Sequence, residues 1–221
     1  ARQRLRRPPR PGDPLLRPFR IGRRGTERRL GRTPHRRQHN IDNALCAIAA
    51  AREAGVPVAT SIAALGSFSL PERRFQILFR DARFLVVDDY AHHPTEIKAT
   101  LSALRSGSFP RVLAVFQPHR YTRLQRLLPQ FARSFAQADR LYLAPLYTAG
   151  QAAIANVDSQ ALARAIEASG QAGVICPPGI DELLDQLRGE LRPGDAVVFL
   201  SAGNLTAAAH RFATRLAQEE P

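Results

Sequence analysis

The sequence predicts an α/β protein built on a doubly wound, mostly parallel sheet. Short apolar runs rich in Val, Leu, Ile and Phe alternate with amphipathic helical stretches from residue 83 onward. Continuous apolar runs are typical of strands covered on both faces, and regular strand–helix alternation is typical of parallel connections. A small helical segment and a basic tail precede this region.

Two helices and two strands are expected before the alternation begins. Apolar residues recur at helical spacing over 39–54, and Gly55 and Pro57 follow as a stop signal. A short helix is expected over 60–65. The segments 73–79 and 83–89 flank a three-residue polar link, which indicates a pair of strands.

Helices and strands then alternate to the end of the chain. Helices are expected over 94–105, 122–137, 159–169, 181–191 and 205–218. Strands are expected over 112–116, 141–146, 174–176 and 196–200. In such sheets a ligand binds beyond the carboxyl ends of the strands, so the loops that follow strands are where functional residues are expected.

The net charge of +13 belongs almost entirely to the tail. Residues 1–37 hold 14 arginines against Asp13 and Glu27, and they carry many Pro and Gly without any apolar period. Such a segment is not expected to fold alone. Three interpretations are open: sequence translated out of frame, which we favour, an inert solvated tail, or an arm that binds RNA phosphates.

Several classes of protein are excluded by composition. The apolar runs fall short of a membrane span, and no secretion signal precedes them, so we expect a cytoplasmic protein. Cys46 and Cys176 are too few for a disulfide framework or a four-cysteine zinc site. Lys98 is the only lysine and lies in a helical segment, so the chain has no GxxxxGK[ST] phosphate loop, and no GxGxxG follows a strand.

Two strand-end loops carry clusters of polar side chains. The first, DDYAHHPTE over 88–96, holds two imidazoles and a phenol beside Pro94, a residue that suits the first turn of a helix. The cluster is therefore expected at an anion-binding helix N-terminus. Adjacent histidines rarely bind one ion, so we expect no metal at His92 and His93.

The second cluster is QPHRYTR over 117–123. Its guanidinium groups offer paired donors that match a carboxylate or a phosphate, which indicates an anionic substrate. The SAGN turn at 201–204 adds a glycine that permits close backbone approach before a helix. A surface ion pair is the alternative interpretation for the arginines.

These loops, in this order, resemble the Mur ligase family, and most closely its member that joins L-alanine to UDP-N-acetylmuramate. The matching segments are HNIDNALCAIA (39–49), RRFQ (73–76), DDYAHHPTEIKATL (88–101), VFQPHRYTR (115–123), VDSQAL (157–162) and SAGN (201–204). The segment PHRYTR favours the L-alanine-adding member over the ligase that reattaches a recycled tripeptide.

The resemblance implies an incomplete, ATP-dependent ligase of peptidoglycan precursor synthesis that acts through an acyl phosphate. Residues 73–221 would be the Rossmann-like C-terminal domain and 38–72 a remnant of the central ATPase domain. The UDP-binding domain and the phosphate loop are expected to be missing, so the chain alone is expected to be inactive. A non-catalytic nucleotide or amino-acid binding module and an RNA-associated protein are the alternatives.

The resemblance also implies roles for individual residues. The expected ATP-binding residues are His39, Asn40, Asn43, Arg74 and Asp89. The expected substrate-binding residues are Tyr90, His92, His119, Arg120 and Arg123, of which His92, His119 and Arg120 are the expected catalytic residues. The implied ligands are UDP-N-acetylmuramate, L-alanine and ATP, with Mg²⁺, whose main ligands in the central domain are expected to be absent from this chain. No membrane or nucleic-acid partner is expected, and the oligomeric state is open.

Overall fold

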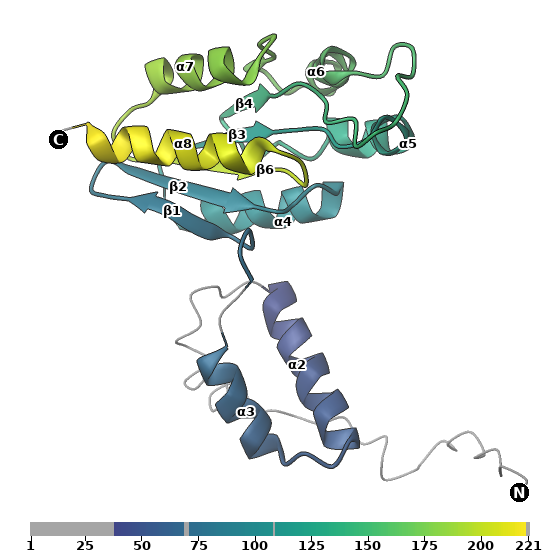
Figure 1. The fold of residues 1–221 in the computed structure, drawn as a ribbon, viewed down its shortest axis with the longest axis vertical. Helices are drawn as coiled ribbons and strands as arrows, with labels where there is room; N and C mark the ends of the chain where they lie inside the picture. Colours follow the sequence, from purple (N-terminus) through teal and green to yellow (C-terminus); the bar gives the residue numbers. More distant parts are fainter. Residues whose placement is uncertain (1–37, 69–70, 108, 220–221) are drawn as a thin grey trace, which may run out of the picture. The chain divides into compact units, whose positions relative to one another are not determined.

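The computed structural model describes residues 38–68, 71–107 and 109–219, and Figure 1 shows their arrangement. They divide into two units, one of residues 38–68 and one of residues 71–219. The interpretations of residues 1–37 fall outside the described residues.

The smaller unit is a pair of helices, as predicted. Helix α2 spans Gln38–Glu53 and helix α3 spans Val58–Ser67. Gly55 turns the chain between them with a φ of 87°, a conformation that glycine adopts without strain. Only Ile48 of the apolar stripe on α2 is buried, and Ile41 and Leu45 are exposed.

The larger unit is built on a six-stranded sheet. Its strands are β1 (Gln76–Arg80), β2 (Phe84–Asp89), β3 (Arg111–Phe116), β4 (Arg140–Leu143), β5 (Val174–Ile175) and β6 (Asp195–Leu200). Their order across the sheet is β1-β2-β6-β3-β4-β5. Strand β1 pairs antiparallel with β2, and every other pairing is parallel. The predicted mostly parallel sheet is confirmed.

Helices cover both faces of this sheet. They are α4 (Pro94–Arg105), α5 (Tyr121–Ala132), α6 (Ser159–Ala168), α7 (Ile180–Glu190) and α8 (Leu205–Gln218). One core cluster joins α4, α5 and α6 to strand residues such as Leu85 and Val87. The other core cluster joins α7 and α8 to Phe84 and Val86, which alternate with Leu85 and Val87 along β2. Because successive strand residues face opposite sides, continuous apolar runs fill both cores, and the predicted doubly wound fold is confirmed (Figure 1).

Three predicted boundaries were wrong for identifiable physical reasons. Strand β1 begins at Gln76 and not at 73, because Arg73 and Phe75 have positive φ angles of 61° and 55° that break the extended backbone. Helix α5 ends at Ala132 and not at 137, because the N–H groups of Arg133 and Ser134 donate to carbonyls three residues back, those of Gln130 and Phe131, and the chain turns. Strand β4 ends at Leu143, two residues before a proline that has no N–H for the ladder.

In the described part of the chain, no helix combines the length and the apolar character that a bilayer crossing requires.

Candidate functional site

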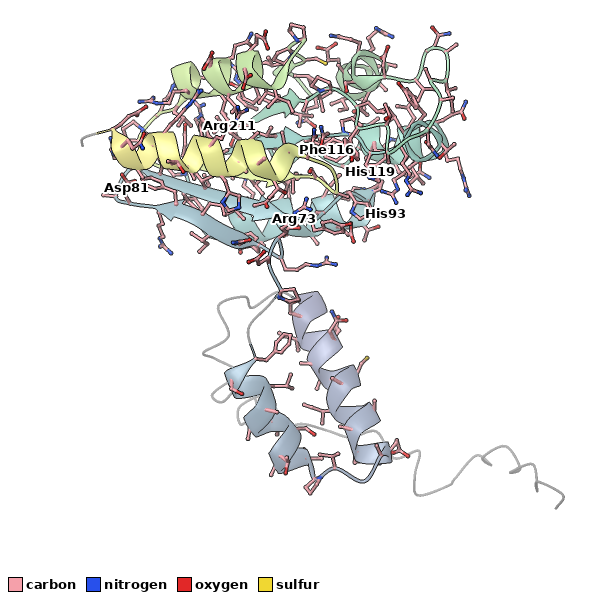
Figure 2. The ribbon with its side chains drawn as sticks, viewed as in Figure 1. Arg73, Asp81, His93, Phe116, His119 and Arg211 are labelled. Atoms are coloured by element: carbon pink, nitrogen blue, oxygen red, sulfur yellow. The ribbon has the colours of Figure 1, made fainter. Side chains whose placement is uncertain are left out.

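The carboxyl ends of four neighbouring strands lie in register at one end of the sheet. The last residue of β6, Leu200, pairs with Asp89 on one side and with Phe116 on the other, and Phe116 pairs with Leu143. The loops that follow these strands therefore begin side by side. We call this end the carboxyl rim. Figure 2 shows His93 and His119 at this end of the sheet and Asp81 at the opposite end.

The loop after β2 is fixed by the start of α4. His93 is the N-cap of α4, where its Nδ1 accepts from Thr95 N and Glu96 completes a capping box. The Glu96 carboxylate accepts the backbone N–H groups of both His92 and His93, each at 3.0 Å. Burial alone would raise the pKa of Glu96, but these donors and the His92 ring lower it below its ordinary value. Glu96 therefore acts as a charged cap that holds both histidines in place.

His92, in the first polar cluster, lies half-buried and close to the second cluster. Its Nδ1 lies 2.8 Å from the carbonyl oxygen of Tyr90, and a carbonyl only accepts, so Nδ1 carries a proton. In the neutral ring, Nε2 is then the nitrogen with a free lone pair. The ring centroid of His92 lies 6.2 Å from that of His119. The structure thus brings together the loops that follow β2 and β3.

His119 is the counterpart of His92 on the second loop. Its ring stacks on Tyr147 with a centroid distance of 5.5 Å, and Arg123 Nη1 lies 3.3 Å from its Nδ1. Because a guanidinium only donates, Nδ1 is the acceptor and the neutral ring carries its proton on Nε2. Burial lowers the pKa of His119, and the charges of Arg123, His92 and Arg120 lower it further. His119 is therefore neutral at pH 7.

This electrostatic arrangement predicts how His119 titrates. We expect its pKa to lie below 6.5, and we expect Arg123→Gln to raise it because one repelling cation is removed. Since folding favours the neutral ring, the stability that His119 contributes is present above pH 6.5 and is lost as the pH falls. NMR titration of the imidazole measures the pKa. Arg211→Gln, on the exposed side of α8, is the control and should leave it unchanged; equal shifts in both variants would contradict the assignment.

Arg120 and Arg123 lie in a cationic pocket at the start of α5. The pocket has a volume of about 390 Å³ and is lined by His93, Arg120, Thr122, Arg123, Arg126 and Leu127. Arg120 is the N-cap of α5 with a φ of 68°, and its N–H donates to Tyr147 O at 2.9 Å. No carboxylate lines the pocket. Guanidinium groups without acidic partners at a helix N-terminus suit an anion.

The five expected ATP-binding residues lie in different units of the chain. His39, Asn40 and Asn43 fall within α2 of the smaller unit. In the larger unit, Arg74 is exposed and its guanidinium lies 5.6 Å from the centroid of the Tyr90 ring. Asp89 is buried, and its carboxylate accepts from Ala91 N at 2.9 Å and from Phe75 N at 3.0 Å. Asp89 thus also anchors the segment that carries Arg74.

Sequence reasoning did not assign a role to Arg73 or Asp88, which meet at the carboxyl rim. Arg73 Nε lies 3.7 Å from Asp88 Oδ2, and its Nη2 donates to Ser201 O at 2.6 Å. Its guanidinium also lies 4.7 Å from the centroid of the Tyr90 ring. The acidic pair at 88–89 and the arginine pair at 73–74 were visible in the sequence, but nothing local indicated which members would pair.

Tyr147 and Gln117 are two further residues at the rim that sequence reasoning left without a role. Gln117 is buried, and its Nε2 donates to Asn204 Oδ1 at 3.0 Å and Pro145 O at 3.3 Å. A Cβ added at Gly203 would lie 2.4 Å from Gln117 Oε1 and 2.8 Å from the Tyr147 ring. Gly203 therefore lets the loops after β3, β4 and β6 pack together, as expected for the glycine of the SAGN turn.

Comparisons with known proteins agree with this architecture. The family model described as "Mur ligase, glutamate ligase domain" matches residues 73–203. A UDP-N-acetylmuramate–L-alanine ligase from Anaeromyxobacter sp. is 47% identical over 171 residues, covering 77% of this chain and 37% of the relative. The enzyme of the same name from Syntrophotalea carbinolica is 42% identical, covering 83% of this chain and 40% of the relative. The chain therefore spans 37–40% of the length of these relatives.

Solved structures give the same assignment. The crystal structure of a UDP-N-acetylmuramate–alanine ligase from Thermotoga maritima matches with a TM-score of 0.67 and 25% identity, covering 83% of this chain and 39% of that one. A murein peptide ligase from Psychrobacter arcticus matches with a TM-score of 0.63 and 27% identity, covering 83% and 38%. The expected family is confirmed: the chain belongs to the Mur ligase family.

Proposed function

We propose that this chain is the C-terminal part of an ATP-dependent ligase that joins L-alanine to UDP-N-acetylmuramate. Residues 73–221 form its C-terminal domain in this proposal, and residues 38–72 form the end of a central ATPase domain. The observation that carries the proposal is the cationic pocket beside two histidines at the carboxyl rim of a Mur ligase domain. The relatives at 42–47% identity bear the name of this activity.

The residues of the pocket suit the acceptor half of such a reaction. Arg120 and Arg123 would hold the carboxylate of L-alanine, with Tyr90 closing the site, so that the amine faces an activated carboxyl group. Nε2 of His92 would accept the proton that the amine releases, and Nε2–H of His119 would donate to the oxygen that gains charge. The amide forms as the C–O bond to phosphate breaks, and phosphate leaves.

The nucleotide is the second substrate in this proposal. Arg74 is exposed, so its guanidinium group suits a phosphate or ribose group, and Asp89 would position it. His39, Asn40 and Asn43, in the smaller unit, stay predicted ATP-binding residues. The described residues offer no comparable set of side chains for Mg²⁺. Within residues 38–68, 71–107 and 109–219, no group of three or more acidic, His or Cys side chains is placed to hold a metal.

Binding of L-alanine to the chain tests the proposal. We expect Arg120→Ala to weaken the affinity for L-alanine by about tenfold or more, because a charge-assisted hydrogen bond contributes about 1.5–3 kcal/mol. Calorimetric titration measures it, and the matched control is Arg80→Gln. Arg80 is exposed and pairs with Leu85 near the start of β2, at the end of the sheet opposite the carboxyl rim. An unchanged affinity in Arg120→Ala, or an equal loss in the control, would remove Arg120 from the amino-acid site.

A further inference from the structure

The cationic pocket carries more positive charge than one carboxylate requires. Arg120, Arg123 and Arg126 all line it, and among the described residues none of the three forms an ion pair with a carboxylate. L-alanine brings a single carboxylate, and further cations would repel its ammonium group. Two arginines suffice for that carboxylate, so Arg126 is left without a ligand in the proposed function.

The backbone of α5 adds to the positive potential of the pocket. Arg120 is the N-cap, and Arg123 and Arg126 follow at intervals of three residues, which places them on neighbouring turns of one helix side. The first turn contains no acidic residue, and no side chain caps the helix from Arg120. Gln151 Oε1 accepts the N–H of Thr122 at 3.3 Å, so one N–H of the first turn is already used, and this neutral amide leaves the partial positive charge of the macrodipole in place.

The loop after β2 supplies a donor on the other wall of the pocket. His93 lines the pocket, and its Nδ1 is already used as an acceptor for the N–H of Thr95. Nε2 is therefore the nitrogen of the neutral ring that carries a proton, and it can donate to an anion. His93 is the N-cap of α4 and Arg126 lies on α5, and neither has a role in binding the amino acid. Both line the same pocket as Arg120 and Arg123, so the pocket has donors left over once the carboxylate of the amino acid is bound.

The size of the pocket leaves room for more than one anionic group. At about 390 Å³ it falls in the range of pockets that hold ligands of several functional groups. A phosphoryl group offers up to three acceptor oxygens and up to two negative charges, which matches one guanidinium fork and one imidazole donor. A second carboxylate would use less of this donor set.

We propose that Arg126 and His93 form a second anion position, beside the amino-acid site, that binds a phosphoryl group. The inference rests on the proposed function for the role of Arg120 and Arg123. Two sources share this chemistry: the acyl phosphate of the activated substrate, and a nucleotide diphosphate. In either case Arg126 holds the phosphate side of the reacting complex while Arg120 and Arg123 hold the amino acid.

Titration of the chain with inorganic phosphate tests this position. We expect Arg126→Gln to weaken phosphate binding by about tenfold. We expect Arg126→Lys to lose less affinity for phosphate, because the charge remains while the paired donors are lost. The affinity for L-alanine should stay within about twofold of the unaltered chain. Arg80→Gln is the matched control, since it removes the same charge at the end of the sheet opposite the carboxyl rim. Because Arg126 is exposed, its replacement should leave the unfolding transition unchanged.

Acetyl phosphate and UDP distinguish the two sources. If Arg126→Gln loses affinity only for acetyl phosphate, the position binds the acyl phosphate. If it loses affinity only for UDP, the position binds the diphosphate. Equal losses of phosphate affinity in Arg126→Gln and Arg80→Gln, or none in either, overturn the second position. If Arg120→Ala leaves L-alanine binding intact while Arg126→Gln weakens phosphate binding, the proposed amino-acid site fails and the phosphoryl position stands.

Discussion

Replacing Phe116 by Ala should lower the free energy of unfolding of the larger unit by about 3–5 kcal/mol, the range for removing a buried aromatic ring. Phe116 is fully buried at the end of β3. Its ring centroid lies 5.5 Å from that of Phe131 and 5.2 Å from that of Phe135. The substitution leaves a cavity between the sheet and α5 that a close-packed core fills only in part. Chemical denaturation followed by circular dichroism measures the loss.

The control for this prediction is an apolar residue of the same sheet that is not buried. Ile77 on β1 is 45% exposed, so Ile77→Ala should cost far less. Phe116 also precedes the loop that carries His119 and Arg120, so Phe116→Ala should weaken L-alanine binding as well. Similar losses of stability in the two variants would show that the aromatic cluster does not anchor this end of the sheet.

Replacing Arg73 by Ala should produce a loss of stability that grows with pH. Asp88 is fully buried, and burial raises its pKa, an effect that Arg73, Thr206 and His210 only partly offset. Without Arg73, an ionised Asp88 would be left in the core without its partner. Breaking a buried pair costs about 3–5 kcal/mol, and we expect the lower end because the Arg73 side chain is 24% exposed.

The sign of the pH dependence follows from the raised pKa of Asp88. A carboxyl group whose folded-state pKa is above its unfolded value favours the folded state most below pH 3.8, and this contribution is lost as the pH rises through the folded-state pKa. Loss of Arg73 raises that pKa further, so the difference between the two proteins is small near pH 4 and largest at neutral pH. Its pH-independent remainder comes from the lost contacts with Ser201 and Tyr90.

A double-mutant cycle isolates the pair. Unfolding free energies of the unaltered chain, Arg73→Ala, Asp88→Asn and the double variant, each measured from pH 4 to 8, give the coupling between the two side chains. Asp88→Asn should remove the pH-dependent part of the effect of Arg73→Ala. A loss in Arg73→Ala that is independent of pH would mean that Asp88 is neutral throughout this range and that the ion pair contributes nothing.

The elements at the carboxyl rim were predictable because their signals are local. Pro94 marks the first residue of α4, and the apolar period of α8 was found over its whole length from Leu205 to Gln218. Short apolar runs indicated the parallel strands, and the rule that their carboxyl ends share one edge placed both polar clusters there. The segment before β1 was not predictable, because the positive φ angles of Arg73 and Phe75 depend on bonds to Tyr90 and Asp89.

The sequence by itself determined the fold class, the family and the two loops that carry the histidines and arginines of the site. The tertiary structure alone decided which side chains meet. Strand β6 inserts between β2 and β3, so Ser201 reaches Arg73, and α4 and α5 bring His93 and Arg126 to one pocket. Periodicity and propensity act over a few residues, whereas these contacts join segments more than thirty residues apart whose proximity depends on the order of strands across the sheet.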